Sequence, residues 1–142
     1  MASVGHNHVM SEPPLPWATK GLVAAFAASG VVHMVRPQVF EPLIPAALPA
    51  PRGLVYASGA AELVCAAGLI ARRAWAPSAS AALLVAVWPG NWTMALTWQR
   101  SSKVPPRAKV LAWARLPLQV PLILAALRSP RRQWREGSAT VR

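Results

Sequence analysis

The chain has 142 residues, enough for one domain; 54% of them are hydrophobic and only 13% are charged. This composition is too apolar and too lightly charged for an ordinary soluble domain, and it favours a membrane protein. The formal net charge of +11 does not indicate nucleic-acid binding, because the basic residues stand at the edges of apolar runs and no recognition motif accompanies them. Such placement is typical of membrane flanks, so the lipid bilayer, and not DNA or RNA, is the expected partner.

Residues 1–19 are expected to form a flexible N-terminal tail. His6 and His8 within it are a weak ligand set, so no metal site is predicted. The first span then runs from Trp17 or Gly21 to Val35, with small residues spaced for close helix contact, namely Gly21, Ala25, Ala28 and Ser29. A cleaved signal peptide is the competing interpretation, because Lys20 precedes a short apolar core. The position of Arg36 and Pro37 directly after that core favours a membrane span.

Five prolines fall between Arg36 and Arg52, so no regular helix is expected in that segment. Its apolar residues Phe40, Leu43, Ile44 and Leu48 indicate that it lies at the membrane interface. Two interpretations remain open: a simple surface connection, or a lid over polar side chains in the spans.

The second apolar run covers residues 53–71 and is followed by Arg72 and Arg73. At about 1.5 Å per residue, it nearly crosses a hydrocarbon core of ~30 Å. A third span is expected over residues 74–98, with Pro89 inside it, and a fourth over residues 110–127. The sequence therefore predicts an all-α, integral membrane four-helix bundle over residues 20–128, and a basic C-terminal tail over residues 129–142.

Four spans place both ends of the chain on one side of the membrane. Eight lysine and arginine residues then lie on that side and six on the other. By the positive-inside rule, the termini are expected to be cytoplasmic.

Five polar side chains within the spans are the candidate site residues: His33, Glu62, Asn91, Arg115 and Gln119. Counted from flanking basic residues at about 1.5 Å per residue, they lie about 5 to 15 Å below the face that bears the first and third loops. Each charged group in hydrocarbon costs about 3 kcal/mol, so such groups usually face one another or a cavity. Glu62 is the only carboxylate in a span and Arg115 the only deep cation, so a contact between them is predicted, with Asn91 and Gln119 supplying hydrogen bonds.

Three further residues have specific expectations. Pro89 frees the carbonyl of Val85 in its helix, and Asn91 or a trapped water is expected to satisfy it. His33, near the surface, suits proton exchange with loop water or a hydrogen bond to a loop carbonyl. Cys65 is the only cysteine, which excludes an intrachain disulfide, and it is expected to be a small buried residue.

Several of these segments resemble the DoxX-like family of small bacterial membrane proteins. The resemblance rests on His33 followed by Arg36-Pro37, on the loop ending LPAPR, and on the segments GLVYASGAAELVCAAGLI, LLVAVWPGNWTMAL and RLPLQVPLI. It covers about residues 21 to 128 and implies a four-helix protein of the bacterial cytoplasmic membrane. DoxX-like relatives are associated with sulfur or redox metabolism, some as the membrane subunit of thiosulfate:quinone oxidoreductases. By matching position, the five polar residues would be the polar residues of that family, and no catalytic role comes with them.

Three functions remain open from the sequence. The first is an accessory subunit of a membrane redox system, which binds a quinone or another head group at Glu62 and Arg115 or anchors a soluble or membrane redox enzyme through its basic tail. The absence of cysteine pairs, haem-type histidine pairs and flavin motifs disfavours a self-sufficient enzyme. The second function is a non-catalytic membrane scaffold, and either role is compatible with a homo-oligomer. The third is a proton-coupled transporter using Glu62, which Arg115 disfavours because a nearby cation keeps a carboxylate ionised.

Overall fold

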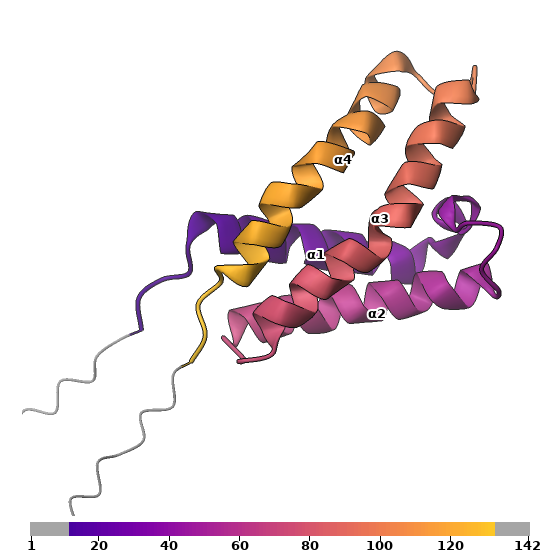
Figure 1. Cartoon of the computed structure of the whole chain (residues 1–142). Helices are drawn as coiled ribbons and strands as arrows, with labels where there is room; N and C mark the ends of the chain where they lie inside the picture. Colours follow the sequence, from indigo (N-terminus) through magenta and orange to yellow (C-terminus); the bar gives the residue numbers. More distant parts are fainter. Residues whose placement is uncertain (1–11, 133–142) are drawn as a thin grey trace, which may run out of the picture.

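The computed structural model describes residues 12–132, and these residues form four α-helices without any β-strand (Figure 1). The helices and the two short 3₁₀ turns are α1 (Trp17–Val35), η1 (Pro37–Val39), η2 (Glu41–Leu43), α2 (Pro51–Ile70), α3 (Ala76–Arg100) and α4 (Pro106–Leu127). All four α-helices are long and apolar enough to cross a membrane. The predicted all-α, four-helix membrane bundle is therefore confirmed. His6, His8 and most of both predicted tails lie outside the described residues.

Prolines mark the starts of three of the helices. Pro51, Pro77 and Pro106 each occupy one of the first two positions of α2, α3 and α4. A proline is tolerated there because the first backbone N–H groups of a helix have no partner within it. For this reason α2 and α4 begin two and four residues before their predicted starts at 53 and 110. Before Pro51, the five-proline segment contains two 3₁₀ turns and no α-helix, in agreement with the prediction of no regular helix there.

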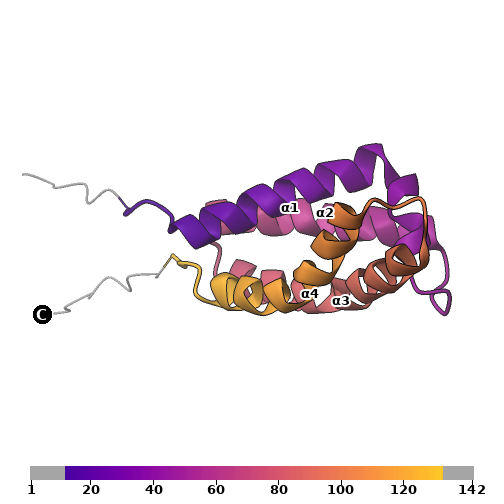
Figure 2. The same cartoon turned by 90° about the horizontal axis from the view of Figure 1, so that it is seen from above.

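The helices pair as two antiparallel hairpins. In both views α1 runs beside α2, and α3 beside α4 (Figures 1 and 2). The hairpins contact each other through α2 with α3 and through α1 with α4, whereas no Cα atoms of α2 and α4 come within 8 Å of each other. Both ends of the described chain leave the bundle at the same end, here named the termini face (Figure 1). The opposite end, with the connections before α2 and α4, is named the loop face.

Glycines allow α1 and α2 to approach closely. A Cβ atom added to Gly30 would lie 2.9 Å from the backbone oxygen of Gly59, and one added to Gly59 would lie 2.6 Å from the Cβ of His33. Such contacts require residues without side chains, as in other membrane helix pairs. The expected contribution of Gly21 is wrong, because nothing lies within 4 Å of the position its Cβ would take.

Two apolar clusters fill the interior. The termini-side cluster includes Leu22 and Phe26 of α1, Cys65 and Leu69 of α2, and residues of α3 and α4. The loop-side cluster is centred on α3 and α4, and its buried members are Met94, Ala95, Ala112 and Leu116. Leu43 of η2 packs against the loop-side cluster, so the proline-rich segment is part of the folded interior at this end. The prediction that Cys65 is a small buried residue is confirmed.

A hydrogen bond between Thr19 and Ser129 joins the first helix to the end of the last. Their hydroxyl oxygens are 3.0 Å apart, and both side chains are buried. Ser129 also donates to the backbone oxygen of Ala125. This contact joins α1 to the end of α4 at the termini face.

Candidate functional site

His33 and Glu62 form a buried pair between α1 and α2. His33 Nδ1 lies 3.6 Å from Glu62 Oε2, and the two residues are 9% and 6% exposed. The pair exists because Gly59, three residues before Glu62, admits the Cβ of His33 against the surface of α2. An imidazolium ring at this distance would form an ion pair with the carboxylate, which lowers the cost of placing either charge in the membrane.

Two further contacts hold the His33 ring. Its Nδ1 lies 2.7 Å from the backbone oxygen of Ser29 and 3.3 Å from the Ser29 hydroxyl. Because a carbonyl oxygen only accepts hydrogen bonds, Nδ1 carries a proton in this arrangement. The ring of Phe40 stacks on the imidazole with centroids 3.8 Å apart and planes inclined by 13°. The ring is thus fixed by its own helix on one edge and by the proline-rich segment on one face.

The carboxylate of Glu62 has an unused acceptor. Oε2 is buried and receives no hydrogen bond from any described residue. A buried acceptor without a donor costs about 1–3 kcal/mol, and more when it is charged. In native proteins such an atom usually has a partner in a water, an ion or a ligand. The geometry at Glu62 therefore accommodates one additional hydrogen-bond donor beside an imidazole ring.

Asn91 and Gln119 form a second polar pair, between α3 and α4. Asn91 Nδ2 donates to Gln119 Oε1 at 2.7 Å, and Gln119 Nε2 donates to the backbone oxygen of Leu84. Gln119 is 3% exposed. The hydrogen bonds that these two amides were expected to supply to a Glu62–Arg115 contact are not formed: both amides link α3 to α4, and neither reaches Glu62. The expected bond from Asn91 to the Val85 carbonyl that Pro89 frees is not formed; the Asn91 amide donates to Gln119.

The predicted contact between Glu62 and Arg115 is wrong. Arg115 is exposed, and its Nη1 atom instead points to the sulfur of Met94 at 3.8 Å. The physical reason is the arrangement of the bundle: α2 and α4 lie diagonally and do not pack against each other, so Glu62 instead faces α1.

His33 lies deeper than its spacing from Arg36 predicts. It sits beside Gly59, which follows the start of α2 by eight residues. Eight residues correspond to about 12 Å of helix, in place of the 5 Å counted from Arg36. The difference arises because α1 ends below the start of α2, and the segment from Pro37 to Ala50 fills the space above its end.

Ser29 and Phe40 contact His33, and the sequence does not single out either contact. Ser29 was assigned to helix packing, although its position one turn before His33 is the spacing at which a side chain reaches the preceding carbonyl. Phe40 was assigned to the membrane interface. Its stacking on His33 brings the proline-rich segment over the polar pair, and this geometry agrees with the lid interpretation.

Fold and site together define a four-helix integral membrane protein with a buried polar layer, in which one pair of polar side chains closes each hairpin. The chain belongs to the family described as "Domain of unknown function (DUF8561)", which matches residues 22–130. That range contains all four helices except the first five residues of α1, and all five candidate site residues. No curated protein and no solved structure matches the chain.

Proposed function

We propose that this protein is an accessory subunit of a bacterial membrane redox system and that it binds a quinone-type head group at His33 and Glu62. The observation that supports the proposal is the buried Oε2 atom of Glu62, which lacks a hydrogen-bond donor and adjoins an imidazole ring. A quinol hydroxyl is a suitable donor for that oxygen. The resemblance to DoxX-like proteins supports a redox setting for the same residues.

Phe40 has a defined part in this proposal. Its ring occupies one face of His33, where a flat aromatic head group would also stack. The proline-rich segment then acts as a lid: Phe40 covers His33 in the unliganded protein and moves aside when a head group binds. When bound, a quinone carries electrons and protons between partners, and His33 with Glu62 are the residues placed to hold and exchange the protons.

Binding can be measured by titrating the purified protein in nanodiscs with a short-chain quinone and following quenching of tryptophan fluorescence. We expect saturable binding by the wild type and an affinity loss of about tenfold or more in Glu62→Gln, because a hydrogen bond to a charged group is lost. Glu12→Gln is the matched control, since Glu12 lies at the termini face and contacts Arg72 and Arg132. Quinone titrations without saturation, or equal affinities of the wild type and Glu62→Gln, would contradict the proposal.

The accessory role also implies an enzyme partner and a defined orientation. We propose that the protein lies in the bacterial cytoplasmic membrane with both termini in the cytoplasm, and that its basic C-terminal residues contact a soluble or membrane redox enzyme. Alkaline phosphatase fused after Arg142 should be inactive, and the same reporter inserted in the connection before Pro106 should be active. Co-purification with and without residues 133–142 tests the partner; recovery of a redox enzyme only with the full chain is the expected result.

A non-catalytic scaffold is the second candidate, and one observation favours it. The two polar pairs each close their own hairpin, His33 with Glu62 and Asn91 with Gln119, as expected of contacts that fix helix packing. A scaffold tolerates replacement of a buried pair by apolar residues of similar volume. Full stability and full cellular function in a His33→Leu, Glu62→Leu double variant would favour this role over ligand binding.

A further inference from the structure

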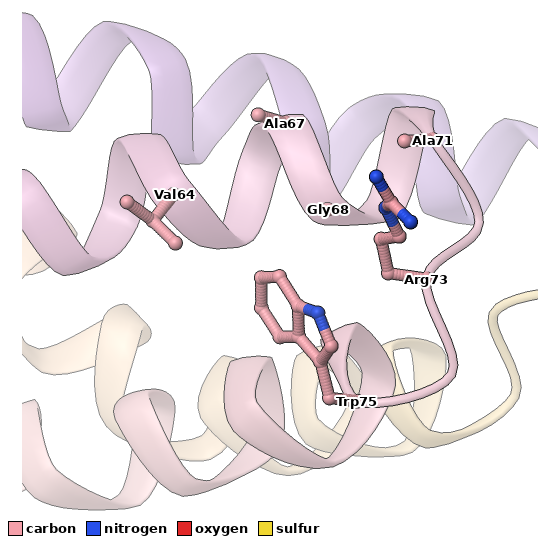
Figure 3. A pocket seen from close by; sticks show the side chains of 6 residues that line it. All are labelled: Val64, Ala67, Gly68, Ala71, Arg73 and Trp75. Atoms are coloured by element: carbon pink, nitrogen blue, oxygen red, sulfur yellow. The ribbon is translucent and has the colours of Figure 1, made fainter.

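A groove lies on the outer surface of α2, near the termini face and apart from His33 and Glu62 (Figure 3). It is lined by Val64, Ala67, Gly68, Ala71, Arg73 and Trp75. In Figure 3, Val64, Ala67 and Ala71 follow one side of α2, the indole of Trp75 points toward that helix from the start of α3, and Arg73 stands at the end nearest the turn. The groove thus has an apolar wall along the helix and a cationic end.

The shape of the groove depends on a glycine. A Cβ atom at position 68 would lie 2.6 Å from Cη2 of Trp75 and 2.9 Å from the Cβ of Ala76. Gly68 therefore allows the indole to lie directly on the backbone of α2. Trp75 nevertheless remains 47% exposed, so part of the indole lies on the outer surface of the bundle.

The two neighbouring arginines of the turn have different surroundings. Arg72, at a backbone φ of 52°, turns its guanidinium to Glu12, with Nη1 3.5 Å from Oε2, and to the backbone oxygen of Pro13. Arg73 is held through its backbone N–H, which donates to Gly68 at 2.9 Å. Its exposed guanidinium forms no ion pair within residues 12–132. The guanidinium of Arg72 is therefore engaged by other residues of the protein, whereas that of Arg73 is available to a ligand at the end of the groove.

The position of the groove indicates which ligand it fits. Helix α2 ends at Ile70, so Arg73 and Trp75 lie just beyond a membrane-spanning segment, at the depth of lipid head groups. Val64 and Ala67 lie one to two turns deeper, at the depth of acyl chains. A guanidinium pairs strongly with phosphate oxygens, and anionic lipids collect near basic juxtamembrane residues.

We propose that this groove is a binding site for one phospholipid with an anionic head group. Arg73 pairs with the lipid phosphate, Trp75 packs beside the glycerol region, and an acyl chain lies along Val64 and Ala67. The site is distinct from the pair of His33 and Glu62, because the buried Glu62 side chain contacts α1, whereas Val64, two residues further along α2, is exposed.

Native mass spectrometry of the full chain in detergent tests this site, using phosphatidylglycerol and phosphatidylcholine with identical acyl chains. We expect one retained lipid and a preference for phosphatidylglycerol of about fivefold, the contribution of one juxtamembrane arginine near anionic lipid. Arg73→Gln should abolish the preference. Val64→Trp, which fills the apolar wall at an exposed position, should reduce retention of both lipids. Arg107→Gln, at an exposed arginine of the loop face, is the matched control and should behave as the wild type.

Three results would overturn the proposal: equal retention of both lipids by the wild type, a preference that persists in Arg73→Gln, or equal losses in Arg73→Gln and Arg107→Gln. Competition by soluble glycerol phosphate distinguishes a phospholipid site from a site for free phosphate. We expect no displacement of phosphatidylglycerol by glycerol phosphate at equal concentration, because the acyl chain contributes to binding. Full displacement would also overturn the lipid assignment.

Discussion

Gly59 and His33 share one contact point between α1 and α2: a Cβ atom on Gly59 would lie 2.6 Å from the Cβ of His33. This proximity brings the imidazole to 3.6 Å from the Glu62 carboxylate one turn along α2. The buried pair thus depends on a position with no side chain. A substitution at Gly59 therefore changes both the packing of α1 against α2 and the position of His33 beside Glu62.

Gly59→Ala should destabilise the protein. The added methyl meets the Cβ of His33 and not the end of a flexible side chain, so the helices must separate, at a cost of about 1–3 kcal/mol. Unfolding in mixed micelles of increasing SDS content measures the change. Gly21→Ala is the control on α1, where the new Cβ meets nothing within 4 Å and stability should be unchanged or slightly higher. Equal stabilities of Gly59→Ala and the wild type would show that the crossing is looser than described.

Double-mutant cycles should show that Glu62 interacts more strongly with His33 than with Arg115. The cycle of His33→Ala with Glu62→Gln should give a coupling energy of about 1 kcal/mol, because the two side chains adjoin. The cycle of Arg115→Gln with Glu62→Gln should give less than about 0.5 kcal/mol, because no direct contact joins them. Both cycles use the same SDS unfolding assay. A larger coupling energy for Arg115 with Glu62 than for His33 with Glu62 would contradict the described pair and support the Glu62–Arg115 contact expected from the sequence.

The amide pair in the second hairpin predicts unequal effects of its two residues. Gln119→Ala removes the acceptor of Asn91 and the donor to the Leu84 carbonyl, whereas Asn91→Ala removes one hydrogen bond only. With about 0.6 kcal/mol as the average for a hydrogen bond between membrane helices, Gln119→Ala should be the more destabilising substitution. The unfolding assay measures both variants, and a larger loss in Asn91→Ala would contradict the described bonding.

Phe40→Ala should expose His33 to reagents in water. The chain has three histidines, so with His6 and His8 replaced by asparagine His33 is the only histidine left to react with diethyl pyrocarbonate, and N-carbethoxyhistidine is followed by its absorbance. In that background, removal of the stacked ring should increase the rate of modification severalfold and cost about 0.5–1.5 kcal/mol of stability. Val39→Ala, at an exposed neighbouring position, is the control. Identical modification rates in both variants would mean that Phe40 does not cover the imidazole.

The sequence predicts the fold well because its signals are local. Apolar runs of nearly membrane length, basic residues at their ends and a proline-dense segment each specify their own conformation. The helix starts at Pro51 and Pro106 differ from the predicted starts, because a proline that excludes the interior of a helix is also a common first residue of one.

The candidate site was only partly predictable, because its geometry depends on which helices are neighbours. Glu62 and Arg115 were paired as the only opposite charges in the spans, yet charge alone does not specify that α2 and α4 lie diagonally. The sequence does contain a signal for the observed pair. Gly30 lies three residues before His33 and Gly59 three residues before Glu62, which indicates a close crossing of the two helices next to both side chains. The bond between Asn91 and Gln119 is not predicted either, although adjacent spans joined by a short loop usually pack together and bring such amides within reach.

The closure of each hairpin by its own polar pair has a consequence for biogenesis. If α1 or α2 left the translocon singly during synthesis, His33 or Glu62 would enter the lipid without its partner. If α1 and α2 leave together as a hairpin, the two side chains are already paired. The first half of this protein could thus leave the translocon as a finished unit once α2 has been made, and the second half could follow in the same way. Two separately expressed fragments, divided between Arg73 and Trp75, would then be expected to reassemble within one membrane.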